Sequence, residues 1–78
     1  MPTVVRQHSW RFFFYSNEGG EPPHTHVESP RGTAKFWLER VSLVGSVGLR
    51  PPELRRMERA VAENRELLLR AWHEHFGD

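Results

Sequence analysis

Cysteine is absent from this chain of 78 residues, so neither a disulfide nor a thiolate metal site can stabilise it. No apolar run approaches the roughly 20 residues that a membrane-spanning helix requires. The first residues lack a basic stretch followed by an apolar run, so we expect no signal peptide, no membrane partner and a cytoplasmic location. A domain of this size buries only about 60–65% of its unfolded surface. Its stability must therefore come from tight packing, a histidine-rich metal site or a partner chain.

Net charge is also nearly absent, because eleven basic side chains oppose ten acidic ones and leave a formal charge of +1. A dedicated nucleic-acid-binding domain carries a larger basic excess. All the basic residues except Lys35 are arginine, whose guanidinium matches phosphate and carboxylate groups, although an arginine-rich genome is the simpler explanation. We expect Arg55, Arg56 and Arg59 to pair with glutamates on a solvated helix face, with contact to RNA or an acidic partner as the alternative. The glutamates are Glu53, Glu58, Glu63 and Glu66.

The first part of the chain, about residues 3–48, has the composition of short strands joined by tight turns. The expected strands are Trp10–Tyr15, His24–Glu28, Thr33–Leu38 and Val41–Val44, with Val4 and Val5 as a short additional one. Turns are expected at residues 16–20, 29–32 and 39–40, and Gly45–Gly48 is expected to end the strand pattern. Short connections of this kind imply an antiparallel meander.

The second part, residues 51–76, has the pattern of helix. Pro52 suits the first helical turn, and Glu53 favours the positive end of the helix dipole. One apolar stripe at helical spacing contains Leu54, Met57, Val61, Leu68, Trp72 and Phe76. Asn64 interrupts this stripe, which favours two helices, with Asn64 capping the second, over one long helix. The sequence thus predicts a single α+β domain over residues 1–78, an antiparallel meander of three to five strands with one or two C-terminal helices packed on one face.

The most informative segment is the double proline followed by His24-Thr25-His26. Side chains alternate along a strand, so His24 and His26 point the same way, roughly 7 Å apart. If Ala34, Phe36 and Leu38 face the helices, the same alternation places the residues between them on the opposite face of the sheet, which the helices leave open. A slip of one residue in strand register would invert the assignment. The open face is expected to gather Arg11, Tyr15, His24, His26, Glu28, Lys35 and Glu39 around Phe13 and Trp37.

Titratable groups mixed with aromatic rings are typical of a functional site, and three chemistries fit this face. Two neutral imidazoles, from His24 and His26, could hold a divalent metal if Glu28 or a histidine of the C-terminal tail completed the set. Alternatively, His24 and His26 could act as acid and base in RNA cleavage, with Lys35 as the third catalytic candidate.

Binding to nucleic acid is the third chemistry, with Arg11 on phosphate and with Phe13, Tyr15 and Trp37 stacking on bases. A purely structural role for the histidines is the simplest alternative. A second pair, His73 and His75, is about 200° apart on a helix, so the two cannot share one ion and are expected at a solvated helix end.

Several motifs in order resemble a family of small bacterial proteins known as domain of unknown function 4160. They are Pro2-Thr3, Arg11-Phe12-Phe13-Phe14-Tyr15-Ser16-Asn17-Glu18, Pro22-Pro23-His24-Thr25-His26-Val27, Ala34-Lys35-Phe36-Trp37-Leu38, Glu53-Leu54-Arg55-Arg56 and Ala71-Trp72-His73-Glu74-His75-Phe76-Gly77. The resemblance extends over almost the whole chain and departs from the family pattern at Glu39-Arg40. The family positions matched on the predicted face are Arg11, Tyr15, Asn17, Glu18, His24, His26, Lys35 and Trp37.

The resemblance implies one half of a compact two-gene module similar to a toxin–antitoxin pair. We therefore expect an interaction protein that binds the cognate small protein of a neighbouring gene, with a homodimer as the alternative. Aromatic residues and arginine dominate interface hot spots, so Phe13, Trp37 and Trp72 are the expected anchors if they are exposed.

Overall fold

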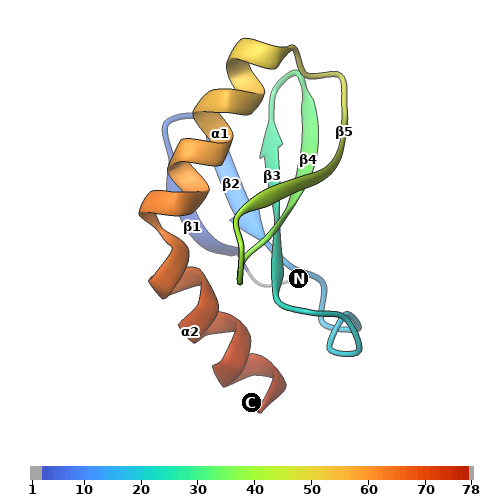
Figure 1. The fold of residues 1–78 in the computed structure, drawn as a ribbon, viewed down its shortest axis with the longest axis vertical. Helices are drawn as coiled ribbons and strands as arrows, with labels where there is room; N and C mark the ends of the chain where they lie inside the picture. Colours follow the sequence, from blue (N-terminus) through green and yellow to red (C-terminus); the bar gives the residue numbers. More distant parts are fainter. Residues whose placement is uncertain (1–2, 78) are drawn as a thin grey trace.

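A computed structural model describes residues 3–77 and confirms the α+β architecture (Figure 1). One antiparallel sheet contains five strands in sequence order: β1 (Thr3–Gln7), β2 (Trp10–Phe13), β3 (His24–Ser29), β4 (Gly32–Trp37) and β5 (Ser42–Val47). Two helices follow, α1 (Pro51–Glu63) and α2 (Arg65–Phe76), and pack on the sheet. Within residues 3–77, neither helix has the length and apolar character needed to cross a membrane.

The hydrophobic core lies between the sheet and the helices. Phe12 pairs with Val27 across β2 and β3, and Val27 pairs with Ala34 across β3 and β4, so a row of apolar side chains crosses the sheet. From α1, Met57 and Val61 pack in the same buried cluster. The inward direction predicted for Ala34, Phe36 and Leu38 is confirmed, since all three are buried. Strand alternation and the helical stripe together therefore define this core.

Strand β5 is longer than the sequence predicts, because it continues through Gly45 to Val47. Lys35 pairs with Gly45 while Phe36 pairs with Leu43, which leaves Val44 as an extra residue in the ladder. Such a bulge re-aims an edge strand without ending it. The prediction that Gly45 ends the strand is therefore wrong.

The break between the helices occurs at Asn64, as predicted, but the side chain of Asn64 does not cap α2. Its Nδ2 donates to Oε1 of Gln7 and to the carbonyl of Ala60, both at 2.9 Å. Asn64 therefore connects the end of α1 to β1 at the point where the helix breaks. The guanidinium of Arg65 donates to the carbonyls of Leu38 (2.7 Å) and Glu39 (2.9 Å), which fixes the start of α2 against the β4–β5 turn.

Glu53 is buried, although a solvated position was predicted for it. Its carboxylate accepts hydrogen bonds from Trp10 Nε1 and Arg31 Nη1, each at 3.2 Å. Burial acts to raise the pKa of Glu53, but hydrogen bonds from Arg31, Trp10 and Ser29 outweigh it and hold the pKa below its ordinary value of 4.5. This carboxylate ties the first turn of α1 to two separate parts of the sheet.

The expected pairing of Arg55, Arg56 and Arg59 with helix glutamates is also wrong for the described part of the chain. The six ion pairs found between residues 3 and 77 include none of these arginines. Two of them, Arg56 and Arg59, instead line a cleft beside Glu53.

Replacing Glu53 by glutamine is expected to lower the free energy of unfolding at neutral pH by about 1–3 kcal/mol, because the amide keeps only one acceptor oxygen and its NH2 group then faces the N–H of Trp10 or Arg31. The lowered pKa means that Glu53 stabilises the fold above the pKa of the unfolded state, and that this contribution disappears as the pH falls through the folded value. The difference between the two proteins should therefore shrink in acid. Urea unfolding at neutral and acidic pH measures both effects. An equal cost for the exposed control Glu58→Gln would contradict the expectation.

Candidate metal centre

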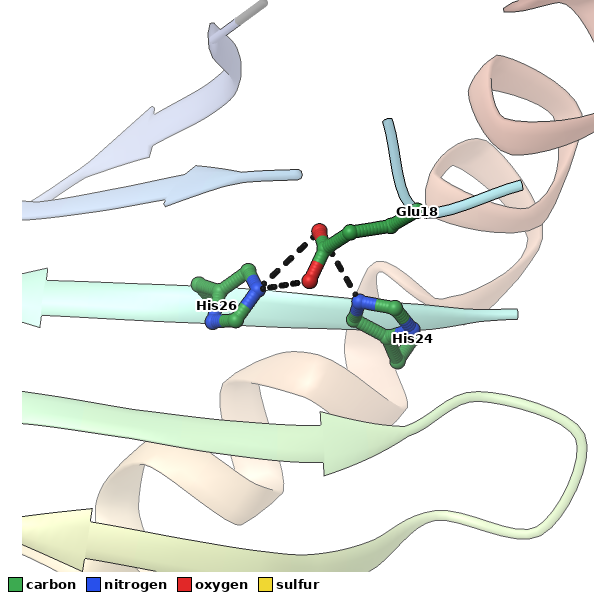
Figure 2. Close-up of side chains that lie close together, drawn as sticks. All are labelled: Glu18, His24 and His26. Carbon is green, nitrogen blue, oxygen red and sulfur yellow. Dashed lines mark hydrogen bonds and ion pairs between the residues drawn. The ribbon is translucent and has the colours of Figure 1, made fainter. Parts of the chain in front are cut away.

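The two histidines of β3 lie side by side, as their spacing predicts, with their ring centroids 5.2 Å apart. A third group joins them from the loop between β2 and β3, the carboxylate of Glu18 (Figure 2). One ligand atom from each of Glu18, His24 and His26 lies within 4.8 Å of the other two. Strand alternation places the imidazoles, and the loop returns Glu18 over them.

A tight turn holds Glu18 in place. The backbone N–H of Glu18 donates to the carbonyl of Tyr15 at 3.2 Å, and the backbone N–H of Tyr15 donates back to Glu18 Oε1 at 2.8 Å. The turn predicted at residues 16–20 is thus the element that aims this carboxylate at β3. One oxygen of the carboxylate is therefore held by a main-chain N–H in addition to its contacts with the imidazoles.

His24 is on the predicted side of β3, but the prediction that it is exposed there is wrong. Its exposed fraction is 0%. Helix α2 extends past the end of the sheet and brings the ring of Trp72 to 4.8 Å from the ring of His24, and Trp37 contacts it edge-on at 5.9 Å. Alternation along a strand cannot predict that α2 extends past the sheet, because this depends on contacts between elements.

The hydrogen bonds of His24 determine which ring nitrogen carries the proton. Nδ1 lies 3.0 Å from the carbonyl oxygen of Pro22, which can only accept, so Nδ1 is the donor. In the neutral ring Nε2 then presents a lone pair. Nε2 is buried 3.0 Å from Glu18 Oε1, yet among the described residues it has no hydrogen-bond partner of acceptable geometry. A lone pair and a carboxylate repel each other at this distance, so a cation between them, either a proton or a metal ion, is favoured in this buried place.

His26 Nε2 lies 3.1 Å from Oε1 and 3.0 Å from Oε2 of Glu18. The ring of Phe13 stacks on the His26 ring at 5.3 Å, and Tyr15 contacts it edge-on at 5.0 Å. His26 is only partly buried, so it forms the solvent side of the cluster. The imidazole is held between two rings and a carboxylate, which leaves it little freedom to turn.

The carboxylate of Glu18 remains ionised well into acid. Burial acts to raise its pKa, but the hydrogen bond from the Tyr15 N–H and the neighbouring imidazoles of His26 and His24 outweigh burial and hold the pKa of Glu18 below its ordinary value of 4.5. Two imidazole nitrogens and one anionic oxygen therefore converge on one point. This is a donor set that divalent transition metals accept.

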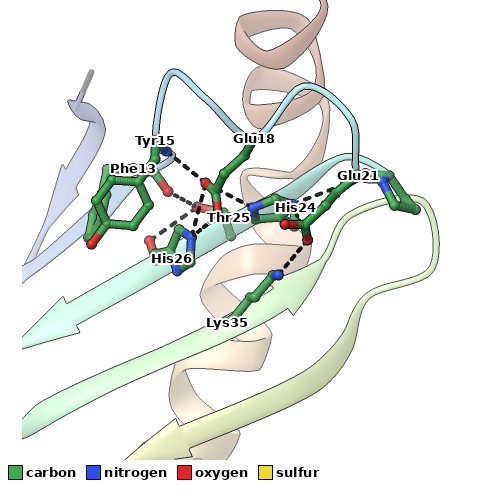
Figure 3. Close-up of polar contacts among 9 residues, drawn as sticks. Phe13, Tyr15, Glu18, Glu21, His24, Thr25, His26 and Lys35 are labelled. Atoms are coloured by element: carbon green, nitrogen blue, oxygen red, sulfur yellow. Dashed lines mark hydrogen bonds and ion pairs between the residues drawn. The ribbon is translucent and has the colours of Figure 1, made fainter. Parts of the chain in front are cut away.

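The cations predicted near the histidines are paired with acidic side chains, and Figure 3 shows this for Lys35 and Glu21. Lys35 Nζ donates to Glu21 Oε1 at 2.6 Å, and this bond is the main cause that lowers the pKa of Glu21. Arg11 pairs with Glu28 at 2.9 Å and lies over the Phe13 ring, 4.2 Å from its centroid. Glu28, predicted as the third metal ligand, thus pairs with Arg11, and Glu18 has the place beside the imidazoles.

The aromatic candidates divide between buried and accessible positions. Phe13 and Trp72 are buried, so the condition set for them as interface anchors is not met. Tyr15 is exposed and Trp37 is partly exposed. The tail histidines His73 and His75 lie in the last turn of α2 and do not join the Glu18 cluster.

Glu18 is the residue that periodicity could not find, because it lies in a turn and not on a strand. Its signal in the sequence was its place among the family motifs, beside Tyr15 and Asn17. Periodicity assigns faces to strand residues only, and it says nothing about the direction of a side chain in a turn.

Taken together, the fold and the cluster define a small α+β protein with a carboxylate and two imidazoles joined at one end of its sheet. A family model described as a domain of unknown function, DUF4160, matches residues 9–73. The chain belongs to the DUF4160 family, as its motifs indicated. Neither the curated proteins nor the solved structures contain a match.

Proposed function

We propose that this protein binds a divalent transition metal ion through Nε2 of His24, Nε2 of His26 and the carboxylate of Glu18. The observation that carries the proposal is the buried Nε2 of His24, which faces a carboxylate without a hydrogen bond. Metal-bound histidines commonly donate their other ring N–H to a carbonyl or carboxylate, and His24 Nδ1 has such a partner in Pro22. Three protein ligands leave a coordination position for water or substrate. The chain has no cysteine to provide another staple for a small domain.

Isothermal titration calorimetry with zinc, nickel and manganese tests this proposal. We expect one ion per chain, and we expect His26→Gln to abolish the binding because it removes a ligand without emptying the buried core. The matched control is the double variant His73→Gln/His75→Gln, which removes two imidazoles outside the cluster and should bind normally. No heat with any of the metals, or loss of binding only in the control, would refute the site.

A separate observation supports the interaction protein implied by the family resemblance. Strand β5 is an edge strand, and its sequence, Ser42 to Val47, contains no charge and no proline. It exposes Leu43 (42%), Val44 (44%) and Val47 (73%). Edge strands are usually protected by charged side chains or proline, because their unpaired backbone groups accept another strand. The proposed occupant is a strand of the cognate small protein, added to β5 in a cytoplasmic complex.

Co-expression with the product of the neighbouring gene tests whether the cognate protein binds to the edge strand β5. We expect the two proteins to co-purify, and we expect Val47→Lys to prevent it because a buried lysine at the new strand pair would lose its hydration. Leu67→Lys is the control, since Leu67 is 47% exposed on α2, away from the edge. Separate elution of the two proteins contradicts the proposal. So does a homodimer that Val47→Lys dissociates, because the edge would then serve a second copy of this chain.

RNA cleavage receives less support from the geometry than metal binding. Lys35 and Arg11, which would hold the phosphate, are already paired with Glu21 and Glu28. His24 has no exposed surface from which to exchange a proton with a substrate.

A further inference from the structure

A cleft of about 410 Å³ lies between the β1–β2 turn and α1, and none of its residues belongs to the metal centre. His8 and Trp10 contribute to the sheet side, Arg56 and Arg59 to the helix side, and Arg31 comes from the β3–β4 turn. A smaller hollow of about 260 Å³ shares Arg31 and Arg56 with it and adds Arg50. Four arginines therefore line the cleft and this neighbouring hollow, together with the carboxylates of Glu53 and Glu63.

Two of these guanidiniums lack a partner. Arg56 and Arg59 are three residues apart on α1 and therefore lie on one side of the helix. Between residues 3 and 77, neither side chain takes part in any of the ion pairs or hydrogen bonds. Arginine side chains without an acidic partner can bind an anion without first breaking an ion pair within the protein.

The third guanidinium, that of Arg31, is oriented by a hydrogen bond to Glu53. Glu53, buried at the base of the cleft, accepts from Arg31 Nη1 at 3.2 Å and from Trp10 Nε1 at 3.2 Å. Only Nη1 of Arg31 is used in this way, so its other N–H groups are available to a ligand. Glu53 is thus a positioning residue, which holds Arg31 at the edge of the cleft.

His8 lines the same cleft from the turn between β1 and β2. It has φ of 59°, in the left-handed region that non-glycine residues adopt less often, and it is the first residue of the two-residue turn between Gln7 and Trp10. Glycine would fit this position without strain. The exposed ring of His8 instead lies edge-on to Trp10, 5.6 Å between centroids. The imidazole of His8 therefore lines the cleft beside Trp10.

We infer that the cleft binds a small phosphate-bearing molecule of about the size of a nucleoside monophosphate, with its phosphate on Arg31, Arg56 and Arg59. The planar forks of arginine match phosphate oxygens in pairs. The cleft volume is within the usual range for small-molecule sites. A net charge of only +1 for the whole chain favours a compact ligand over a long nucleic-acid strand.

Titration of isotope-labelled protein with AMP, followed by NMR without added metal, tests this inference. We expect saturable one-to-one binding that shifts the amide signals of His8, Arg56 and Arg59. The double variant Arg56→Gln/Arg59→Gln should bind AMP roughly tenfold more weakly or worse, because charge-assisted hydrogen bonds are lost. Both side chains are exposed, so the variant should fold normally. The control Arg55→Gln/Arg70→Gln loses the same charge outside this cleft and should keep its affinity.

Four results would overturn the inference. The first is the absence of saturable binding, and the second is equal weakening in both double variants, which indicates unspecific attraction. The third is loss of AMP binding in His26→Gln, which would assign the ligand to the metal centre. The fourth is tighter binding of a single-stranded RNA dodecamer than of AMP with the same dependence on Arg56 and Arg59, which would make the cleft part of a nucleic-acid surface.

Discussion

Replacing His24 by alanine is expected to lower the free energy of unfolding of the metal-free protein by about 2–5 kcal/mol, the range for truncating a large buried side chain to alanine. The ring has no exposed surface and touches both Trp72 and Trp37, so its removal leaves a cavity at the junction of sheet and helix. The hydrogen bond from Nδ1 to the Pro22 carbonyl is lost at the same time. Urea unfolding in the presence of a chelator measures the cost.

The variant His24→Phe separates packing from metal chemistry. Phenylalanine keeps the ring contacts with Trp72 and removes the lone pair that faces Glu18, but it is larger and loses the hydrogen bond to the Pro22 carbonyl, so we expect a cost of about 1–3 kcal/mol. Metal binding should nevertheless disappear in both variants, because Nε2 is gone. The exposed His75 provides the control, since His75→Ala should leave metal affinity intact. A His24→Ala variant as stable as His75→Ala would contradict the burial argument, and a His24→Phe variant that still binds metal would exclude His24 as a ligand.

Saturation with zinc is expected to raise the melting temperature of the native protein by roughly 10–20 °C. A ligand at about one hundred times its dissociation constant adds roughly 2.7 kcal/mol to stability, and each kcal/mol shifts the melting temperature of a domain of this size by about 4–8 °C. The shift should be absent in His26→Gln and should reverse on addition of a chelator. Differential scanning calorimetry measures it directly.

The same zinc effect should fade in acid, because protons compete with the metal for the imidazole lone pairs. Protonation of Glu18 should contribute to this loss only at lower pH, because the pKa of its carboxyl group is below the ordinary value of 4.5. A zinc shift of equal size in His26→Gln, or one that persists unchanged in strong acid, would show that the ion binds elsewhere.

The architecture followed from local patterns in the sequence. Alternation along residues 24–28 placed His24 and His26 on one side of a strand, and the apolar stripe from Leu54 to Phe76 identified the helical face that packs on the sheet. The interruption at Asn64 marked the helix break. All of these features depend on spacing within a single element, which the sequence records directly.

The candidate site depended on contacts between elements, and there the sequence was less informative. Glu18 reaches the imidazoles because its loop folds back over β3, and His24 is buried because α2 extends past the sheet to place Trp72 against it. Glu53 was expected in solvent for the same reason, since only the fold brings Trp10 and Arg31 to it. Periodicity assigns a face to a residue but does not say what lies opposite that face.

A crystal of the protein grown with zinc, measured at the zinc absorption edge, tests the metal centre most directly. We predict an anomalous peak at about 2.0–2.2 Å from Nε2 of His24, Nε2 of His26 and a carboxylate oxygen of Glu18, the usual zinc-to-ligand distances. The His24 Nδ1–Pro22 hydrogen bond should be retained in that crystal. Strong peaks only at His73 or His75, or no peak between Glu18 and the two imidazoles, would contradict the proposed function.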